Sequence, residues 1–199
     1  MFQVRIHGRG GQGVVTAAEL MSVAAFREGR YAQAFPSFGS ERTGAPVVSF
    51  CRISDTTIRS HEPISTPDAL IVQDVSLLNQ IDVVGGLKAS GYLLLNTLRT
   101  PQELGLTDAA AALPPGHLVS VPATELALEH VGRPVSNVPL LGAFAALTGL
   151  ISLDSVVAAI EERFPGPLAR SNAAAAEAAY RIVAAHRQVT KETAHVAAG

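Results

Sequence analysis

Residues 2–13, FQVRIHGRGGQG, carry the strongest indication of the fold class of this chain. Its first six residues, Phe2 to His7, predict a strand, and the glycines after them predict a tight turn. A helix is predicted from Val14 to Arg27, ended by Gly29. Because Glu19 is its one charged residue before the last turn, most faces of this helix must be buried. A strand, a glycine turn and a buried helix in this order are typical of an α/β domain.

The same alternation of short apolar runs and helical patterns continues along the chain. Further strands are predicted at residues 31–35, 46–53, 69–73, 91–96 and 117–121, and further helices at residues 76–87, 123–131, 139–147, 153–164 and 168–189. No linker, repeat or charge block divides the sequence, so we expect a single domain over residues 1–189 and a frayed tail at residues 190–199. The predicted fold class is α/β, with a single doubly wound, largely parallel sheet, flanking helices and a helical C-terminal part.

The composition of the 199 residues excludes several classes of protein. With 15 basic and 17 acidic side chains the net charge is -2, which argues against a nucleic-acid binder. Cys51 is the single cysteine, so the chain alone cannot form an internal disulfide, a CxxC zinc site or a cysteine-ligated iron–sulfur cluster. A reduced, cytoplasmic setting is expected. Charged residues make up 16% of the chain, against about 25% in typical soluble domains, which suggests a deep core or a surface covered by partners.

Two stretches of the sequence partly resemble a signal peptide or a membrane-spanning helix. The N-terminus lacks the apolar core of a signal peptide, because Arg5 and Arg9 interrupt it. Residues 134–153 carry no charge and have the length of a membrane helix. Since this run contains Pro139 and Gly149, we predict a buried helix within it and no membrane span.

The glycine turn is a candidate phosphate site. Gly8, Gly10 and Gly13 form a GxGxxG pattern between a predicted strand and a predicted helix, where backbone amides can hold a phosphate. The alternative is a tight turn that binds nothing. A nicotinamide dinucleotide would need an acidic residue about 20 residues further on, and residues 31–35 contain none, which argues against NAD.

A second candidate is the connection at residues 35–46, FPSFGSERTGAP, whose glycines, prolines and aromatics suggest an ordered functional loop. Arg42 in it could pair with a phosphate, with a partner's carboxylate, or with Glu41. Asn96 and Thr97 end a predicted strand and should reach the same edge of the sheet, as ligand contacts or as a turn or helix cap.

No catalytic residue and no metal site is predicted. The six histidines do not pair at metal-ligand spacing, and the common hydrolase, zinc-protease and P-loop motifs do not occur. His7 is expected to be structural, and Cys51 is expected to be a small core residue.

These motifs, in this order, resemble the gamma subunit of pyruvate:ferredoxin oxidoreductase and related 2-oxoacid:acceptor oxidoreductases. The resemblance is carried by HGRGGQGV (7–14), QAFPSFGSERTGAPV (33–47), IVQD (71–74), LLLNT (93–97) and RPVSNVPLLGAFAALTG (133–149). The SERTGAP form is similar to the pyruvate-type branch rather than to the oxoglutarate-type branch.

The resemblance implies a complex that oxidatively decarboxylates a 2-oxoacid and transfers the acyl group to coenzyme A. It implies thiamine diphosphate, Mg and 4Fe–4S clusters in partner subunits (alpha, beta and a ferredoxin-like delta), with ferredoxin or another acceptor taking the electrons. This chain would help to bind coenzyme A and to close the active site. The implied contacts to coenzyme A are Gly8, Arg9, Gly10, Gly11, Gln12, Gly13, Arg42, Thr43, Gly44, Asn96 and Thr97, with the two arginines suited to its phosphates.

Three alternatives remain open at this point. The chain could be a pure scaffold of such a complex, it could serve a relative that acts on aryl, indolyl or branched-chain 2-oxoacids, or it could be a free-standing NAD-dependent dehydrogenase. Because the resemblance implies covering partners, exposed apolar surface on the isolated chain is expected to be interface, and the isolated chain is expected to be poorly soluble.

Overall fold

The computed structural model describes residues 1–37 and 43–197, with side chains up to residue 190. Its centre is a six-stranded sheet in the order β2-β3-β1-β4-β5-β6. The strands are β1 (Phe2–Arg9), β2 (Tyr31–Pro36), β3 (Pro46–Ser54), β4 (Ala69–Val72), β5 (Tyr92–Asn96) and β6 (Leu118–Val121). The predicted α/β class is confirmed. The sheet is mixed: β1, β4, β5 and β6 pair in parallel, whereas β3 runs antiparallel to both β1 and β2.

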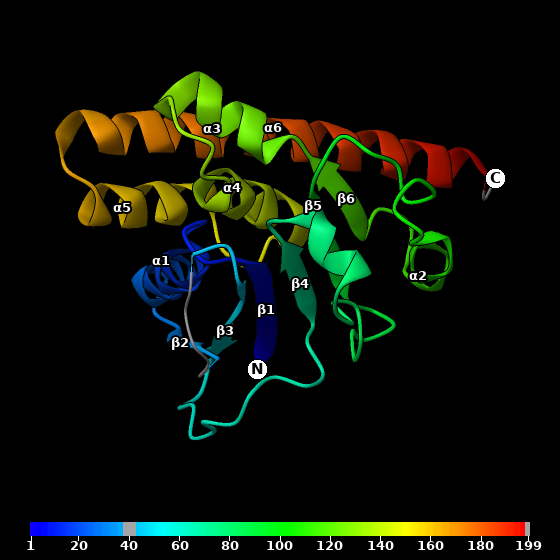
Figure 1. Cartoon of the computed structure of the whole chain (residues 1–199), viewed down its shortest axis with the longest axis horizontal. Coiled ribbons are helices and arrows are strands. Elements are labelled where there is room, and N and C mark those ends of the chain that lie inside the picture. Colours follow the sequence, from blue (N-terminus) through cyan, green and yellow to red (C-terminus); the bar gives the residue numbers. More distant parts are fainter. Residues whose placement is uncertain (38–42, 198–199) are drawn as a thin grey trace.

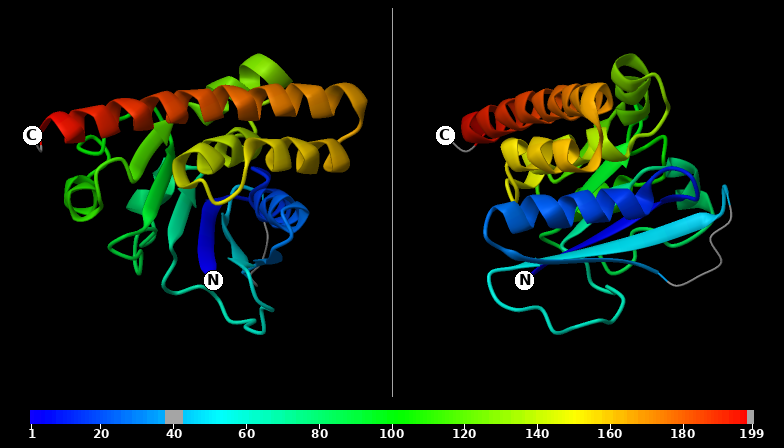
Figure 2. Two further views of the ribbon diagram at one scale, coloured as in Figure 1. Left: turned by 180° about the vertical axis from the view of Figure 1, so that it is seen from behind. Right: turned by 90° about the vertical axis from the view of Figure 1, so that its left-hand side faces the viewer.

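Five long helices lie on one side of this sheet (Figures 1 and 2). They are α1 (Val14–Arg27), α3 (Ala123–Val131), α4 (Asn137–Thr148), α5 (Leu153–Arg163) and α6 (Gly166–Ala197). α1 and α4 pack against the sheet, and α3 and α6 form an outer layer over α4. The predicted helical C-terminal part is therefore confirmed. α6 extends to Ala197, beyond the predicted end at residue 189.

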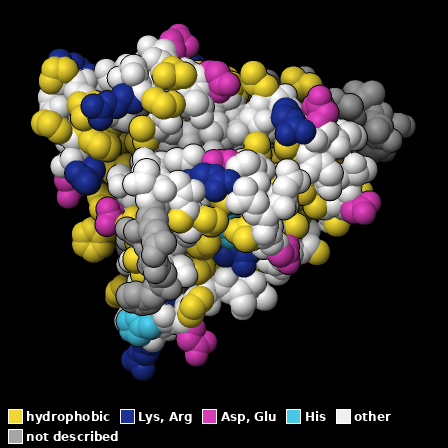
Figure 3. All heavy atoms as spheres, in the orientation of Figure 1, with side chains coloured by type: hydrophobic (Ala, Val, Ile, Leu, Met, Phe, Trp, Pro, Cys, Tyr) yellow, Lys and Arg dark blue, Asp and Glu magenta, His cyan; other side chains and the backbone are white. Residues whose placement is uncertain are grey.

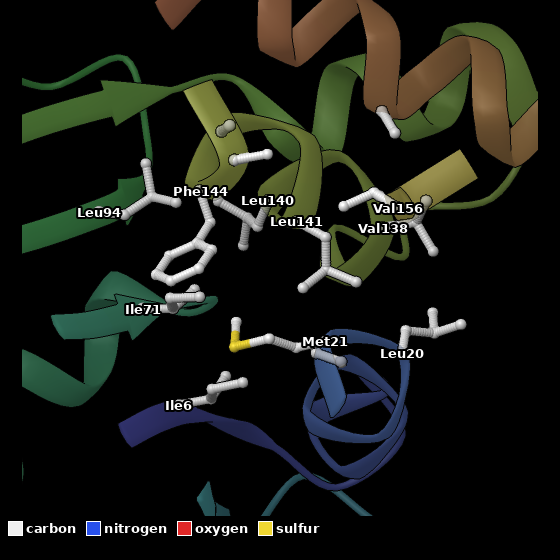
Figure 4. Packing of buried hydrophobic residues seen from close by; sticks show 14 of the residues in the cluster. Ile6, Leu20, Met21, Ile71, Leu94, Val138, Leu140, Leu141, Phe144 and Val156 are labelled. Atoms are coloured by element: carbon white, nitrogen blue, oxygen red, sulfur yellow. The ribbon is translucent and has the colours of Figure 1, made fainter. Parts of the chain in front are cut away.

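The main core lies between the sheet and these helices. Figure 4 shows Phe144 of α4 reaching toward Ile71, with Met21 of α1 beside Ile6. Each residue of α4 from Asn137 to Leu147 is buried, because the sheet, α1 and α6 enclose this helix. The uncharged run is thus an interior helix of the domain. Among the residues that the structure describes, no helix is both long and apolar enough to cross a membrane.

The opposite face of the sheet is covered by shorter elements. A 3-10 helix, η1 (Val75–Asn79), and a short α2 (Thr107–Ala112) pack there over the inward-facing leucines of β4 and β5. The predicted helix at residues 76–87 is wrong. Asp74 caps η1 by accepting a hydrogen bond from the amide of Ser76, and the chain then bends so that two later carbonyls, of Val83 and Gly85, accept hydrogen bonds from Arg5.

Several loops lie together at one edge of the sheet because of the directions of the strands. β1, β2, β4, β5 and β6 all end there, and β3 begins there. The chain passes to one side of β1 through α1 and to the other side through β4, so this edge contains the switch point where α/β sheets bind ligands.

Candidate functional site

The N-terminus of α1 is open toward solvent at this edge. Its N-cap is Gly13, which is in the left-handed conformation (φ 72°) and has no side chain to cap the helix. The amides of Val14, Val15 and Thr16 have no acceptor within the helix, and its first turn holds no acidic residue. A cavity of about 300 Å³ lies in front of them, lined by Arg9, Gly10, Gly11, Gly13, Val14, Val15, Thr16 and Val47. Free amides beside a cavity can bind an anion.

Arg9 fastens the glycine loop to its surroundings. Its Nε donates to Asp74 Oδ2 at 2.9 Å, Nη2 donates to Ser76 Oγ at 2.7 Å, and Nη1 donates to the carbonyl oxygen of Gly44 at 3.0 Å. Arg9 also lines the cavity. Three of its five N–H donors are thus used inside the protein, and two remain for a ligand.

Asp74 organises the loop from the end of β4, and the sequence analysis missed it. Besides Arg9, it accepts a hydrogen bond from Gln12 Nε2 at 3.1 Å, while Gln12 Oε1 accepts from the amide of Arg9 at 2.7 Å. Burial raises the pKa of Asp74, but hydrogen bonds from Ser76 and Gln12 and the charge of Arg9 outweigh it, so the pKa lies below its usual value. The signal in the sequence was an acidic residue just after a buried strand.

The end of the β2–β3 connection pairs with the glycine loop. Gly10 forms a parallel bridge with Thr43, its amide donates to the carbonyl of Ala45 at 2.9 Å, and its carbonyl accepts from Gly44 at 3.1 Å. The structure therefore brings Thr43 and Gly44 to the predicted site. Arg42 lies outside the described residues, and its contact with coenzyme A stays a prediction.

Asn96 and Thr97 reach the same edge, but their side chains bond within the protein. Asn96 Nδ2 donates to the carbonyl of Gln73 and to Thr124 Oγ1, both at 2.8 Å, and its Oδ1 accepts from the amide of Thr124 at 3.1 Å. Thr97 Oγ1 accepts from the amide of Arg99. These bonds match the turn and helix-cap alternative, and neither residue lines the cavity at α1.

Two glycines permit the close approach of other elements. A Cβ atom on Gly8 would overlap Val14, and one on Gly13 would overlap the side chain of Asn137. Asn137 begins α4 and donates from Nδ2 to the carbonyl of Gly13 at 3.2 Å, so it joins α4 to the glycine loop. This role of Asn137 was not predicted from the sequence, although the residue lies in the motif of residues 133–149.

Buried polar groups lie beneath the loop. His7 is buried; its Nε2 accepts from Arg5 Nε at 3.0 Å, and burial together with the charge of Arg5 lowers its pKa to about 4. The side-chain amide of buried Gln73 and Nδ1 of His7 have no hydrogen-bond partner among the described residues. Cys51 is a core residue, as predicted, and burial raises its pKa to about 12. Within the described ranges, no three His, Cys, Asp or Glu side chains could together hold a metal ion.

Comparisons with known proteins agree with this architecture. The model of the family "Pyruvate ferredoxin/flavodoxin oxidoreductase" matches residues 3–182. The chain is 48% identical over 180 residues to the pyruvate synthase subunit PorC of Methanothermobacter marburgensis, covering 90% of this chain and 96% of the relative. It is 49% identical, with the same coverage, to the common gamma subunit of the pyruvate/ketoisovalerate oxidoreductases of Thermococcus kodakarensis.

Solved structures show the same fold. The pyruvate oxidoreductase subunit PORC of Thermotoga maritima superposes with a TM-score of 0.76 at 34% identity, covering 90% of this chain and 95% of that one. The 2-oxoglutarate:ferredoxin oxidoreductase of Magnetococcus marinus superposes with a TM-score of 0.68 at 18% identity, over 93% of this chain and 31% of that one. Since the family model and close relatives span nearly the whole chain, this protein belongs to the pyruvate ferredoxin/flavodoxin oxidoreductase family and is a gamma-type subunit of an oxidoreductase complex.

Proposed function

We propose that this subunit binds coenzyme A for its complex and holds the diphosphate at the N-terminus of α1. The observation that carries the proposal is the uncapped start of α1, where Gly13 is the N-cap and no acidic residue occupies the first turn beside the cavity. In α5, by contrast, Ser152 caps the helix through its side chain. The enzyme from Magnetococcus marinus, which shares this fold, has coenzyme A and succinyl-CoA bound.

Each part of the loop has a task in this proposal. The amides of residues 14–16 donate hydrogen bonds to the phosphate oxygens, and the two remaining N–H groups of Arg9 add positive charge. Asp74 and Gln12 fix the loop in the shape that exposes these donors. Coenzyme A, when bound, supplies the thiol that accepts the acyl group. In this proposal the subunit also helps to close the active site over coenzyme A, and the hydrogen bond between Gly44 and Gly10 holds the end of the β2–β3 connection against the glycine loop.

The chemistry of decarboxylation and electron transfer belongs to partners in this proposal. Alpha and beta subunits hold thiamine diphosphate and Mg, 4Fe–4S clusters lie in beta and a ferredoxin-like delta subunit, and ferredoxin or another acceptor takes the electrons in the cytoplasm. Phe26 and Leu98, each 74% exposed, are large apolar side chains that are available for contact with such partners.

A single position on α1 tests the role of its N-terminus. Thr16 is half-buried at the third position of the helix and lines the cavity. In Thr16→Glu, the new carboxylate suits the helix dipole and preserves folding, but it repels phosphate. We expect the KM for coenzyme A of the assembled complex to rise at least about tenfold. In the matched variant Thr16→Gln, the KM should stay within about twofold, because the side chain has the same size without the charge.

The scaffold alternative makes a different prediction for the same pair. If the loops only contact partner subunits, Thr16→Glu and Thr16→Gln will give the same KM for coenzyme A. Any effect of the substitutions will then be a smaller fraction of assembled complex. Size-exclusion chromatography of the complex, run beside the kinetics, separates these outcomes.

A further inference from the structure

A second cavity, of about 220 Å³, opens on the other side of the start of α1. It shares Gly11, Gly13 and Thr16 with the first cavity, so the two lie next to each other on either side of the glycine loop. Its remaining wall comes from the α3–α4 connection and from the junction of α5 with α6. Nothing in the function proposed above uses this cavity.

The cavity is basic. Arg133, just after α3, and Arg163, the last residue of α5, both line it, and no carboxylate occurs among its described lining residues. Neither guanidinium forms an ion pair with another described side chain, whereas Arg27 and Arg30 are paired on the same side of the molecule. Arg163 lies over the ring of Phe164, with 5.6 Å from Cζ to the ring centroid, which orients it and leaves its N–H groups free.

Basic side chains with hydrophobic ones between them lie at the end of the molecule where α5 turns into α6 (Figure 3). Two arginines without acidic partners repel each other and gain most from an anion that bridges them. The helix dipoles do not decide the sign of the electrostatic potential in the cavity. Three helices, α1, α4 and α6, begin at this cavity, while α3 and α5 end there. The positive charge is therefore that of Arg133 and Arg163.

The cavity also has surfaces suited to a nucleobase. Val131, Val135 and Leu168 form an apolar part of its lining. Asn172, only 7% exposed, also lines it and uses Nδ2 to donate to the carbonyl of Leu168 at 2.8 Å. Its Oδ1 accepts no hydrogen bond from the other described residues and can accept one from an exocyclic amine.

We propose that Arg133 and Arg163 bind the 3′-phosphate of coenzyme A, whose adenosine occupies this second cavity. Coenzyme A carries two separate anionic groups, a diphosphate and a 3′-phosphate on the ribose, and the structure offers two adjacent cavities that share Gly11, Gly13 and Thr16. The first cavity, with its helix amides, suits the diphosphate, and the second suits a phosphomonoester held by two guanidinium groups. This inference rests on the function proposed above.

The test compares coenzyme A with dephospho-coenzyme A, which lacks the 3′-phosphate, in the assembled complex. We expect the wild-type complex to have a KM for coenzyme A that is at least about tenfold lower than its KM for dephospho-coenzyme A. In Arg133→Gln and Arg163→Gln, this preference should fall toward unity, because the KM for coenzyme A rises more than the KM for dephospho-coenzyme A. Arg163→Lys should keep part of the preference. Arg170→Gln, at an exposed arginine of α6 outside the cavity, should keep all of it.

A second readout does not depend on turnover. Adenosine 3′,5′-bisphosphate should inhibit the wild-type complex more strongly than adenosine 5′-phosphate, and the two glutamine variants should lose that difference. The proposal is overturned if the variants keep the wild-type preference for the 3′-phosphate, or if they weaken both substrates equally and disturb assembly. An unchanged KM in Thr16→Glu would instead refute the diphosphate site, so the two failures are distinguishable.

Discussion

The guanidinium of Arg9 and the carboxylate of Asp74 form an ion pair, with Nε and Oδ2 separated by 2.9 Å, that joins the glycine loop to the end of β4. The pair crosses the switch point of the sheet, since β1 and β4 are the strands between which the chain changes direction. It also determines what the loop can bind, because it fixes the loop beside the open start of α1. The site therefore depends on a carboxylate that contacts no proposed ligand.

Asp74→Asn tests this dependence through stability. The amide keeps the shape but loses the charge that accepts hydrogen bonds from Arg9, Gln12 and Ser76. We expect a loss of about 1–3 kcal/mol in the free energy of unfolding at pH 7, measured by urea denaturation of the full chain. Asp108→Asn, at an exposed residue of α2, is the control and should change stability by less than about 0.5 kcal/mol.

The same carboxylate gives a pH dependence. Because the pKa of Asp74 is lowered in the folded chain, its stabilising contribution is present above the unfolded pKa of about 3.9 and is lost as the pH falls through the folded value. Asp74→Asn should therefore differ from the wild type at neutral pH and converge with it in acid. A constant difference at all pH values would contradict this account.

Protonation of His7 changes the free energy of unfolding in a higher pH range than protonation of Asp74 does. Its folded pKa of about 4 lies below the ordinary value of 6.5, because burial and the charge of Arg5 oppose protonation. Its contribution to stability is complete above pH 6.5 and falls by about 3 kcal/mol as the pH drops to about 4. His7→Gln, which keeps an acceptor for Arg5, should remove this slope from the unfolding free energy. His130→Gln, at a partly exposed residue of α3, is the control and should retain it.

Asn96→Ala distinguishes a cap from a ligand contact. The side chain makes three hydrogen bonds, to the carbonyl of Gln73 and to the hydroxyl and amide of Thr124. We expect a stability loss of about 1–3 kcal/mol and a KM for coenzyme A within about twofold of the wild type. Thr97→Ala provides the comparison at the neighbouring position. A raised KM at unchanged stability would show that Asn96 contacts coenzyme A.

Gly142→Ala tests the packing of α4 against α6. A Cβ atom at this position would overlap the carbonyl oxygen of Ala176, and backbone cannot move aside as a flexible side chain can. Overpacking of this kind costs about 1–3 kcal/mol or more, so the melting temperature of the full chain should fall by several degrees. An unchanged melting temperature would show that the two helices can separate slightly without loss.

The elements with strong local signals were predictable from the sequence. α1 and α3 have the predicted bounds, because Gly29 and Gly132 follow them as stop signals and their apolar spacing is helical. The predicted shared edge of the glycine loop and the β2–β3 connection is confirmed by the bridge between Gly10 and Thr43. The helix bounds could be predicted from residues close in the sequence, and the shared edge could be predicted from the direction of the strands.

The remaining features depend on distant partners. The segment at residues 76–87 has a helical pattern. However, its carbonyls at Val83 and Gly85 accept hydrogen bonds from Arg5 and not from amides of a helix. Asp74 is 65 residues from Arg9, and Asn137 is 124 residues from Gly13, so a local pattern could not identify the partners of these two residues. The antiparallel placement of β3 between β1 and β2 is likewise a tertiary result.

The place of coenzyme A at the start of α1 can be observed in a structure of the whole complex with coenzyme A bound, determined by electron cryomicroscopy. We predict that the diphosphate lies within hydrogen-bond distance, about 3 Å, of the amides of residues 14–16, with Arg9 still bonded to Asp74. Coenzyme A bound entirely by partner subunits, with no contact to residues 9–16 of this chain, would contradict the claim.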